Sequence, residues 1–155
     1  MKKIVFVCLG NICRSPVAEG IMLNLKEKYQ LDLEIDSAGT ASYHVGEAPD
    51  KRTIANAAKH GVDLTPLRAR QFKVNDFDKF DWILAMDVNN LNTLIKMTNE
   101  QKHLQKVKLM LDFAHSSQNA EVPDPYYGTE NDFELVFNLV DKACLSIVKR
   151  IFDSN

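Results

Sequence analysis

The sequence lacks several patterns that would assign it to a familiar class of protein. It has three cysteines among 155 residues, an odd number without framework spacing, which excludes a small secreted disulfide scaffold. Cys8 and Cys13 do not form a C-x2-C pair, and the four histidines show no ligand spacing, so no structural metal site is expected. The ATP-binding pattern G-x-x-x-x-G-K-[ST] is also absent.

The chain also lacks an excess of charge of one sign and any long hydrophobic run. It carries 19 basic and 21 acidic residues for a net charge of -2, so neither a nucleic acid nor an anionic membrane is expected as a partner. No segment reaches the length of a membrane span. The apolar run Ile4 to Leu9 is too short for a signal peptide, and Gly10, Asn11 and Arg14 interrupt it. We expect a cytoplasmic monomer.

The composition fits one soluble domain over residues 1–155, with 45% hydrophobic and 26% charged residues. Short apolar segments predict a strand at Lys3 to Val7, a second at Leu31 to Ile35 that ends at Ser37 to Gly39, a third at Asp81 to Met86 and a fourth at Val107 to Leu111. Four such strands fit a sheet that is buried on both faces.

Segments between and after the strands carry helical patterns. Ser15 is a candidate cap with Pro16 at the first helical position. Further helices are predicted at Lys51 to Lys59 and through Leu91, Leu94 and Ile95. A final long helix carries one apolar stripe: Phe133, Val136, Phe137, Val140, Ala143, Cys144, Ile147, Val148 and Ile151. Alternating strands and helices predict an α/β fold with a parallel sheet, in which ligands bind at the carboxyl ends of the strands.

The stretch V-C-L-G-N-I-C-R-S-P follows the first strand at that edge of the sheet. Gly10 and Asn11 tolerate positive φ, so the loop can curl and direct several N–H groups at one anion. Arg14 adds a planar charged fork, and this surrounding favours the thiolate of Cys8. The expected phosphate-binding residues are Leu9, Gly10, Asn11, Ile12, Cys13, Arg14 and Ser15. Taken alone, C-x5-R also fits a buried structural cysteine and an arginine in a surface ion pair.

Further motifs stand in a fixed order along the chain: D-S-A-G-T at Asp36 to Thr40, H-G-V-D-L at His60 to Leu64, R-A-R-Q at Arg68 to Gln71 and D-P-Y-Y at Asp124 to Tyr127. Together with the first loop they resemble the low-molecular-weight protein tyrosine phosphatases over nearly the whole chain. The resemblance implies a Rossmann-like fold of the phosphotyrosine phosphatase I type, with four parallel strands and helices on both faces. It also implies hydrolysis of phosphotyrosine in proteins and of small aryl phosphates, without a metal or organic cofactor.

The resemblance assigns roles to single residues. Cys8 becomes the nucleophile that forms a phosphocysteine, and Asp124 becomes the general acid that protonates the leaving phenolate and then activates water. Tyr43, Tyr126 and Tyr127 are expected to form walls for an aromatic ring, and His44 is expected at the rim.

A supporting set is also implied around the loop. Ser15 and Ser37 are expected to hold Asn11 in a left-handed conformation by hydrogen bonds, although Ser15 also fits a simple helix cap. Cys13 is expected to form a reversible disulfide with the nucleophile that protects it from over-oxidation. The chain departs from many relatives at Leu67, where they carry a histidine that joins this support.

Three other functions fit parts of the pattern. Arsenate reduction uses a similar loop but needs additional cysteines, and the segment Trp82 to Asn92 contains none. Some bacterial relatives act on arginine phosphate with a threonine where this chain has Ile12, so the apolar residue favours tyrosine. A non-catalytic phosphate-binding module is disfavoured because Cys8, Arg14 and Asp124 are all present.

Overall fold

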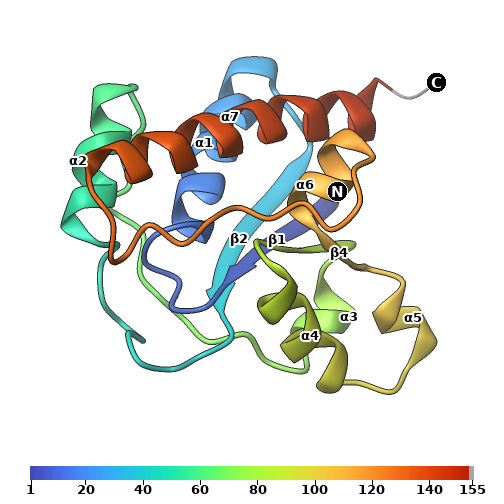
Figure 1. Ribbon diagram of the computed structural model, residues 1–155. Helices are drawn as coiled ribbons and strands as arrows, with labels where there is room; N and C mark the ends of the chain where they lie inside the picture. Colours follow the sequence, from blue (N-terminus) through green and yellow to red (C-terminus); the bar gives the residue numbers. More distant parts are fainter. Residues whose placement is uncertain (154–155) are drawn as a thin grey trace.

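Strand β1 (Lys2–Cys8) lies inside a parallel sheet, where both of its edges are paired (Figure 1). In the computed structural model, which describes residues 1–153, four strands follow the order β2-β1-β3-β4. The other three strands are β2 (Leu33–Gly39), β3 (Trp82–Ala85) and β4 (Val107–Leu109). The predicted α/β fold with a four-stranded parallel sheet is confirmed. The last two residues of the expected domain, 154 and 155, lie outside the described residues.

Helices cover both faces of this sheet (Figure 1). One face carries four helices, among them the two longest, and the other carries three short ones. The first group is α1 (Ser15–Tyr29), α2 (Lys51–Lys59), α6 (Met110–His115) and α7 (Glu130–Phe152), and the second is α3 (Asp76–Lys79), α4 (Val88–Lys96) and α5 (Gln101–Leu104). Within residues 1–153, every helix is too short or too polar to traverse a lipid bilayer.

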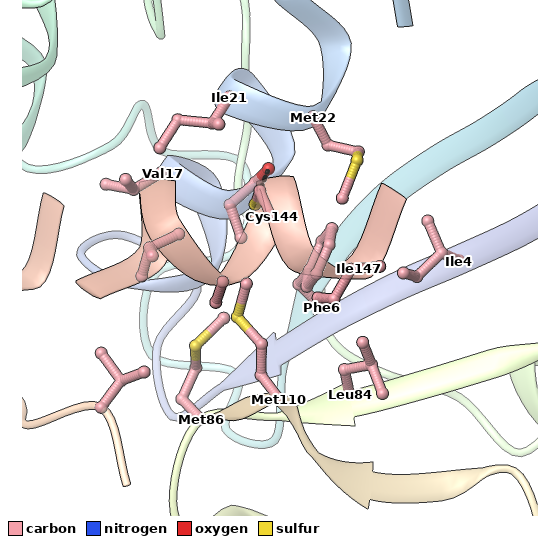
Figure 2. Packing of buried hydrophobic residues seen from close by; sticks show 14 of the residues in the cluster. Ile4, Phe6, Val17, Ile21, Met22, Leu84, Met86, Met110, Cys144 and Ile147 are labelled. Atoms are coloured by element: carbon pink, nitrogen blue, oxygen red, sulfur yellow. Dashed lines mark hydrogen bonds between the residues drawn. The ribbon is translucent and has the colours of Figure 1, made fainter. Parts of the chain in front are cut away.

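The continuous apolar run of β1 supplies both halves of the core. Ile4 and Phe6 belong to the cluster under α1 and α7, whereas Val5 and Val7 belong to the cluster on the opposite face. Figure 2 shows the first cluster, in which Cys144 of α7 lies between apolar side chains. A strand buried on both faces needs no polar alternation, which explains the sequence pattern. The rigid strand delivers Cys8 to the carboxyl edge of the sheet.

The observed elements differ from the predicted ones at several ends. Strand β2 begins at Leu33 rather than Leu31, and it includes Ser37 to Gly39, which were expected to end it, because β1 pairs with it as far as Cys8 opposite Gly39. Strand β4 ends at Leu109, and the next two apolar residues begin α6. A short apolar run does not distinguish a strand from a buried helix, so this boundary was wrong. The four-residue helices α3 and α5 were not predicted.

Helix α1 also begins differently from the prediction. Arg14 occupies the N-cap position and Ser15 the first helical position, without a side-chain capping bond. The Ser15 hydroxyl is engaged within the loop that precedes the helix, so the simple cap was wrong. The predicted apolar stripe of α7 is buried in the core except for the half-buried Val148, and a capping box between Thr129 and Asp132 fixes the start of that helix.

Candidate active site

The loop between β1 and α1 curls at the carboxyl edge of the sheet. Asn11 adopts φ 58°, the left-handed conformation that its residue type tolerates. The neighbouring strand continues to hold the loop, since Thr40 N donates to Cys8 O (2.9 Å) and Ala41 N donates to Leu9 O (2.9 Å). A Cβ at Gly39 would lie 2.7 Å from Leu9 O, so this glycine permits the close approach.

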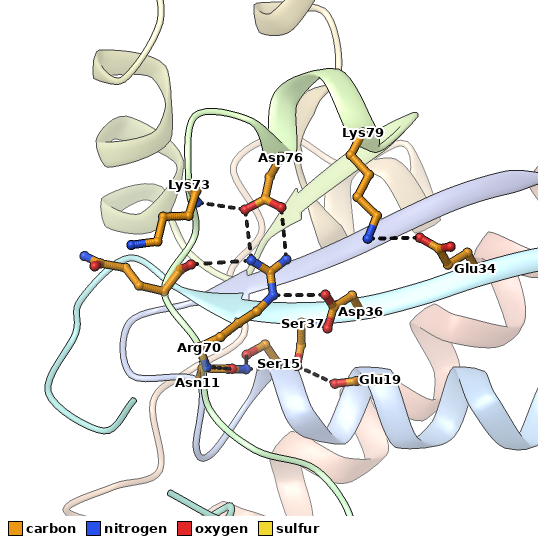
Figure 3. A network of polar contacts seen from close by, with 11 residues as sticks. Asn11, Ser15, Glu19, Glu34, Asp36, Ser37, Arg70, Lys73, Asp76 and Lys79 are labelled. Carbon is orange, nitrogen blue, oxygen red and sulfur yellow. Dashed lines mark hydrogen bonds and ion pairs between the residues drawn. The ribbon is translucent and has the colours of Figure 1, made fainter. Parts of the chain in front are cut away.

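Asn11 is held by hydrogen bonds at both ends of its amide (Figure 3). Its Nδ2 donates to Ser15 Oγ (2.8 Å) and Ser37 Oγ (2.9 Å), and its Oδ1 accepts from Arg70 N (3.0 Å). The side chains of Asn11, Ser15 and Ser37 are buried. The structure therefore brings together the three residues of the implied support and adds the backbone of Arg70 to them.

Cys8 and Arg14 lie on the inner side of the same loop, each 2% exposed. The Cys8 Sγ is 3.0 Å from Ser15 Oγ, so the hydroxyl is placed to donate to a thiolate. Arg14 Nη1 donates to Asp87 Oδ2 (2.7 Å) and to Val122 O (3.0 Å). Burial alone would lower the pKa of Arg14, but the negative charges of Cys8, Asp87 and Asp124 raise it above the ordinary value.

Asp87 is a site residue that the sequence analysis missed. It stands shortly after β3 and caps α4 by accepting from Asn90 N (2.8 Å) through Oδ1, while its Oδ2 holds Arg14. Its position in the sequence could have indicated this role, because an aspartate shortly after a buried strand of a parallel sheet lies at the carboxyl edge, where ligands bind. Its partner Arg14 is 73 positions away, so no local pattern connects the two.

Asp124 reaches the loop because the chain before it is anchored to the sheet. Val122 N donates to Met86 O (2.8 Å), and the carbonyl of Val122 receives the guanidinium of Arg14. The carboxylate of Asp124 then lies 3.7 Å from Arg14 Nη2, and its other oxygen accepts from Tyr126 N (3.1 Å). Its side chain is 44% exposed, at the mouth of the site.

These residues enclose a pocket of about 290 Å³ with the Cys8 thiol in its lining. Tyr43 and the fully exposed Tyr127 stand at its mouth beside Tyr126, and His44 contacts Glu47 from the rim. The pocket is lined by Cys8, Leu9, Gly10, Ile12, Cys13, Arg14, Tyr43, His44, Asp124, Tyr126 and Tyr127. Asn11, Ser15 and Ser37 are not in the lining and support the loop from within.

The other two cysteines are buried thiols. Burial, with the nearby charge of Asp50, raises the pKa of Cys13 to about 12, and Cys8 also acts on it electrostatically. Burial also raises the pKa of Cys144 well above its ordinary value. Among residues 1–153, no three His, Cys, Asp or Glu side chains are grouped to hold a metal ion.

Comparison with known proteins places this geometry in a family. A putative low molecular weight protein-tyrosine-phosphatase of Synechocystis sp. is 46% identical, over 92% of this chain and 91% of its own. The low molecular weight phosphotyrosine protein phosphatase of Gallus gallus is 40% identical over 97% and 96%. The crystal structure of a protein tyrosine phosphatase from Entamoeba histolytica with Hepes in the active site superposes with a TM-score of 0.91 at 38% identity, over 99% and 98%.

The family model described as low molecular weight phosphotyrosine protein phosphatase matches residues 3–154, almost the whole chain. The resemblance seen in the short motifs therefore extends through the sheet, its helices and the loop at its carboxyl edge. The chain belongs to the low molecular weight phosphotyrosine protein phosphatase family.

Proposed function

We propose that this protein hydrolyses phosphotyrosine in proteins, and small aryl phosphates, through a phosphocysteine intermediate. One observation carries the proposal: the buried thiol of Cys8 shares a pocket with the free edge of the Arg14 guanidinium and the carboxyl group of Asp124. A nucleophile, an anion-binding fork and a proton donor are the three groups that the reaction requires.

In the first step the Cys8 thiolate attacks phosphorus, and the bond from phosphorus to the phenolic oxygen breaks. Loop N–H groups and Arg14 bind the three non-bridging oxygens, whose charge they stabilise in the transition state. Asp124, as the carboxylic acid, transfers its proton to the departing phenolate. The hydroxyl of Ser15, at 3.0 Å from Sγ, stabilises the thiolate before attack.

In the second step water attacks the phosphorus of the phosphocysteine, and the bond between phosphorus and Sγ breaks. Asp124, now a carboxylate, accepts a proton from that water, so the acid and base roles belong to one residue. Inorganic phosphate and the Cys8 thiolate are released. Each group has then returned to its starting protonation state.

The walls of the pocket support an aryl substrate. Tyr43, Tyr126 and Tyr127 present rings at the mouth, where they can flank the ring of a phosphotyrosine, with His44 at the rim. Ile12 gives the lining an apolar side chain, which favours an aromatic leaving group over the guanidinium of arginine phosphate. We propose that the protein acts as a monomer, since Cys8, Arg14 and Asp124, the three reacting groups, all belong to one chain.

We also propose that Cys13 protects the nucleophile. Peroxide oxidises the Cys8 thiolate to a sulfenic acid, whose sulfur is attacked by Cys13 with loss of water to form a disulfide. A thiol reductant then restores both cysteines. The raised pKa keeps Cys13 a thiol that resists direct oxidation, and its proton leaves with the sulfenic oxygen as water when the disulfide forms. Such chemistry needs a reducing compartment, which supports the cytoplasm.

Arsenate reduction is the rival that the structure disfavours most directly. It requires a further cysteine that can reach the first pair and pass a disulfide to a reductant. The remaining cysteine, Cys144, is 0% exposed within the core cluster under α7 (Figure 2). Reaching the loop would require unpacking that helix.

The test is an assay of the reduced protein on p-nitrophenyl phosphate and a phosphotyrosine peptide, with EDTA present. We expect turnover that Cys8→Ser abolishes and Asp124→Ala lowers by roughly 10²–10⁴-fold. Arsenate reduction coupled to thioredoxin is followed in parallel. A folded protein without phosphatase turnover contradicts the proposal; arsenate reduction would then indicate a reductase, and silence in both assays would indicate a binding module.

A further inference from the structure

Glu19 of α1 lies beside the loop, and no cation of residues 1–153 forms an ion pair with its carboxyl group; its partner is Ser37 (Figure 3). Its Oε1 lies 2.6 Å from Ser37 Oγ. The nearby guanidinium of Arg70 is already engaged by Asp36 (2.9 Å) and by both oxygens of Asp76 (3.0 and 3.2 Å). One arginine therefore faces three carboxyl groups and pairs with two of them, which leaves Glu19 with a hydroxyl as its partner.

The hydrogen bonds that join Asn11, Ser37 and Glu19 all run in one direction. Ser37 Oγ accepts from Asn11 Nδ2 (2.9 Å), so its single hydrogen is free to be donated toward Glu19 Oε1. That arrangement requires an acceptor at Oε1, which an ionised carboxylate provides best. A proton on Glu19 weakens the bond or reverses it, and Ser37 then becomes a poorer acceptor for Asn11.

Glu19 also changes its charge in the range where cytoplasmic enzymes work. Burial raises its pKa to about 7, against the lowering effect of the Ser37 hydroxyl. The charged groups that act on it are Asp36 of β2, which raises the pKa, and Arg70 of the segment between α2 and α3, which lowers it. Its own helix contributes no charge to this balance within the described residues.

We infer that Glu19 is a positioning residue for the phosphate-binding loop, whose ionised carboxylate acts through Ser37 to strengthen the hydrogen bonds that hold Asn11. Asn11 carries the left-handed backbone on which the curl of the loop depends. When the hydrogen bonds of Asn11 are stronger, the loop N–H groups stay directed at the anion. The affinity for an oxyanion is therefore higher when Glu19 is ionised. This inference rests on the proposed function, because it concerns the same anion site.

Direct repulsion between the carboxylate and a bound anion has the opposite sign. It would weaken anion binding when Glu19 ionises and would act through space, whether or not Ser37 is present. The positive charge of Arg70 on the same side offsets part of it. The two effects can therefore be separated by the sign of the pH dependence and by removal of the Ser37 hydroxyl.

The first experiment measures the dissociation constant of sulfate, a dianion that does not titrate in this range, by NMR of loop amides at pH 5.5 and pH 8.5. Glu19→Gln should bind like the wild type at pH 5.5 and about threefold to tenfold more weakly at pH 8.5. Glu27→Gln, the same substitution at an exposed position of α1, should match the wild type at both pH values. In a Ser37→Ala background, Glu19→Gln should add no pH-dependent effect.

A ratio between variant and wild type that is the same at both pH values would assign Glu19 a purely structural role and overturn the inference. Tighter sulfate binding by Glu19→Gln at pH 8.5 would also overturn it, in favour of repulsion. The second experiment uses the wild type alone and follows the Glu19 carboxyl by carbon NMR. We expect its titration near neutral pH to move to lower pH on saturation with sulfate, by reciprocity of the coupling; no shift or an upward shift contradicts the inference.

Neither measurement depends on turnover. If the folded wild type fails to bind sulfate at all, the anion site and the proposed function fail together with this inference. If sulfate binds normally but without the expected pH-dependent difference, the role of Glu19 fails and the phosphatase proposal stands.

Discussion

Arg14 belongs to the phosphate-binding loop and Arg70 contacts that loop through Asn11, and the two arginines differ in how many bonds their guanidinium groups make. Arg70 makes bonds from Nε, Nη1 and Nη2 to Asp36, Asp76 and the carbonyl of Gln71. Arg14 is held through Nη1 alone, by Asp87 and the carbonyl of Val122, and its Nη2 faces Asp124 at 3.7 Å. A saturated arginine stabilises the fold, whereas one held along a single edge keeps donors for a ligand.

The largest effect is expected where Arg14 keeps its positive charge but loses its planar guanidinium group. Arg14→Lys should lower kcat on p-nitrophenyl phosphate by about 10³-fold, since a lysine ammonium cannot hold Asp87 and present two donors to the phosphoryl oxygens together. Arg68→Lys is the matched control, because this exposed arginine donates, within residues 1–153, to the backbone carbonyls of Thr65 and Leu67 alone. Equal kcat values for the two variants would contradict the distinction between the arginines.

At Arg70 we expect the opposite: a loss of stability with little loss of activity. Arg70→Lys should lower the free energy of unfolding by about 1–3 kcal/mol, because Asp36 and Asp76 lose a shared partner at a partly buried site. Its kcat should fall by less than about tenfold, since the backbone N–H of Arg70, rather than its side chain, binds Asn11. Urea unfolding and steady-state kinetics on the same samples, again beside Arg68→Lys, separate the two effects. A loss of kcat as large as that of Arg14→Lys would show that this arginine is not merely structural.

The sequence predicted the parts of this site that are continuous along the chain. Cys8 to Ser15 are neighbours, so their residue types alone indicated a curled loop between a strand and a helix. The alternation of strands and helices likewise predicted the sheet and the edge at which the loop lies. Asp124 is remote from the loop, and its role was inferred through the resemblance to the family.

The residues that were missed act through distant partners. Asp87 meets Arg14 across 73 positions, and Arg70 meets Asn11 across 59. Glu19 was missed although it lies one turn from Ser15, because its isolation depends on how Arg70 distributes its bonds. The predicted end of the second strand was misplaced because pairing with β1 extends it through Ser37 to Gly39. Contacts of this kind exist only after the chain has folded.

The smallest expected effect concerns the stability cost of Glu19, the carboxyl group that neither arginine pairs. Its pKa is about 7 in the folded protein against the ordinary 4.5, so folding favours its protonated form. Below about pH 4.5 Glu19 is protonated in both the folded and the unfolded chain, and its ionisation costs no stability. Above that pH the carboxyl group ionises more readily in the unfolded chain, so the free energy of unfolding falls until the pH passes about 7, the pKa in the folded protein. Glutamine does not titrate, so Glu19→Gln should gain about 1–2 kcal/mol over the wild type between pH 4.5 and pH 8, less than the full pKa difference implies because water screens this half-buried carboxyl group.

Urea unfolding at those two pH values measures the gain, with Glu27→Gln expected to show none. A difference between Glu19→Gln and the wild type that does not change with pH would mean that the carboxyl finds a partner in the unfolded chain or escapes burial in the folded one. The stability result can be combined with the sulfate affinity of the same variant. The same ionisation would then weaken the fold as a whole while it tightens the loop, which separates stability from anion binding at one side chain.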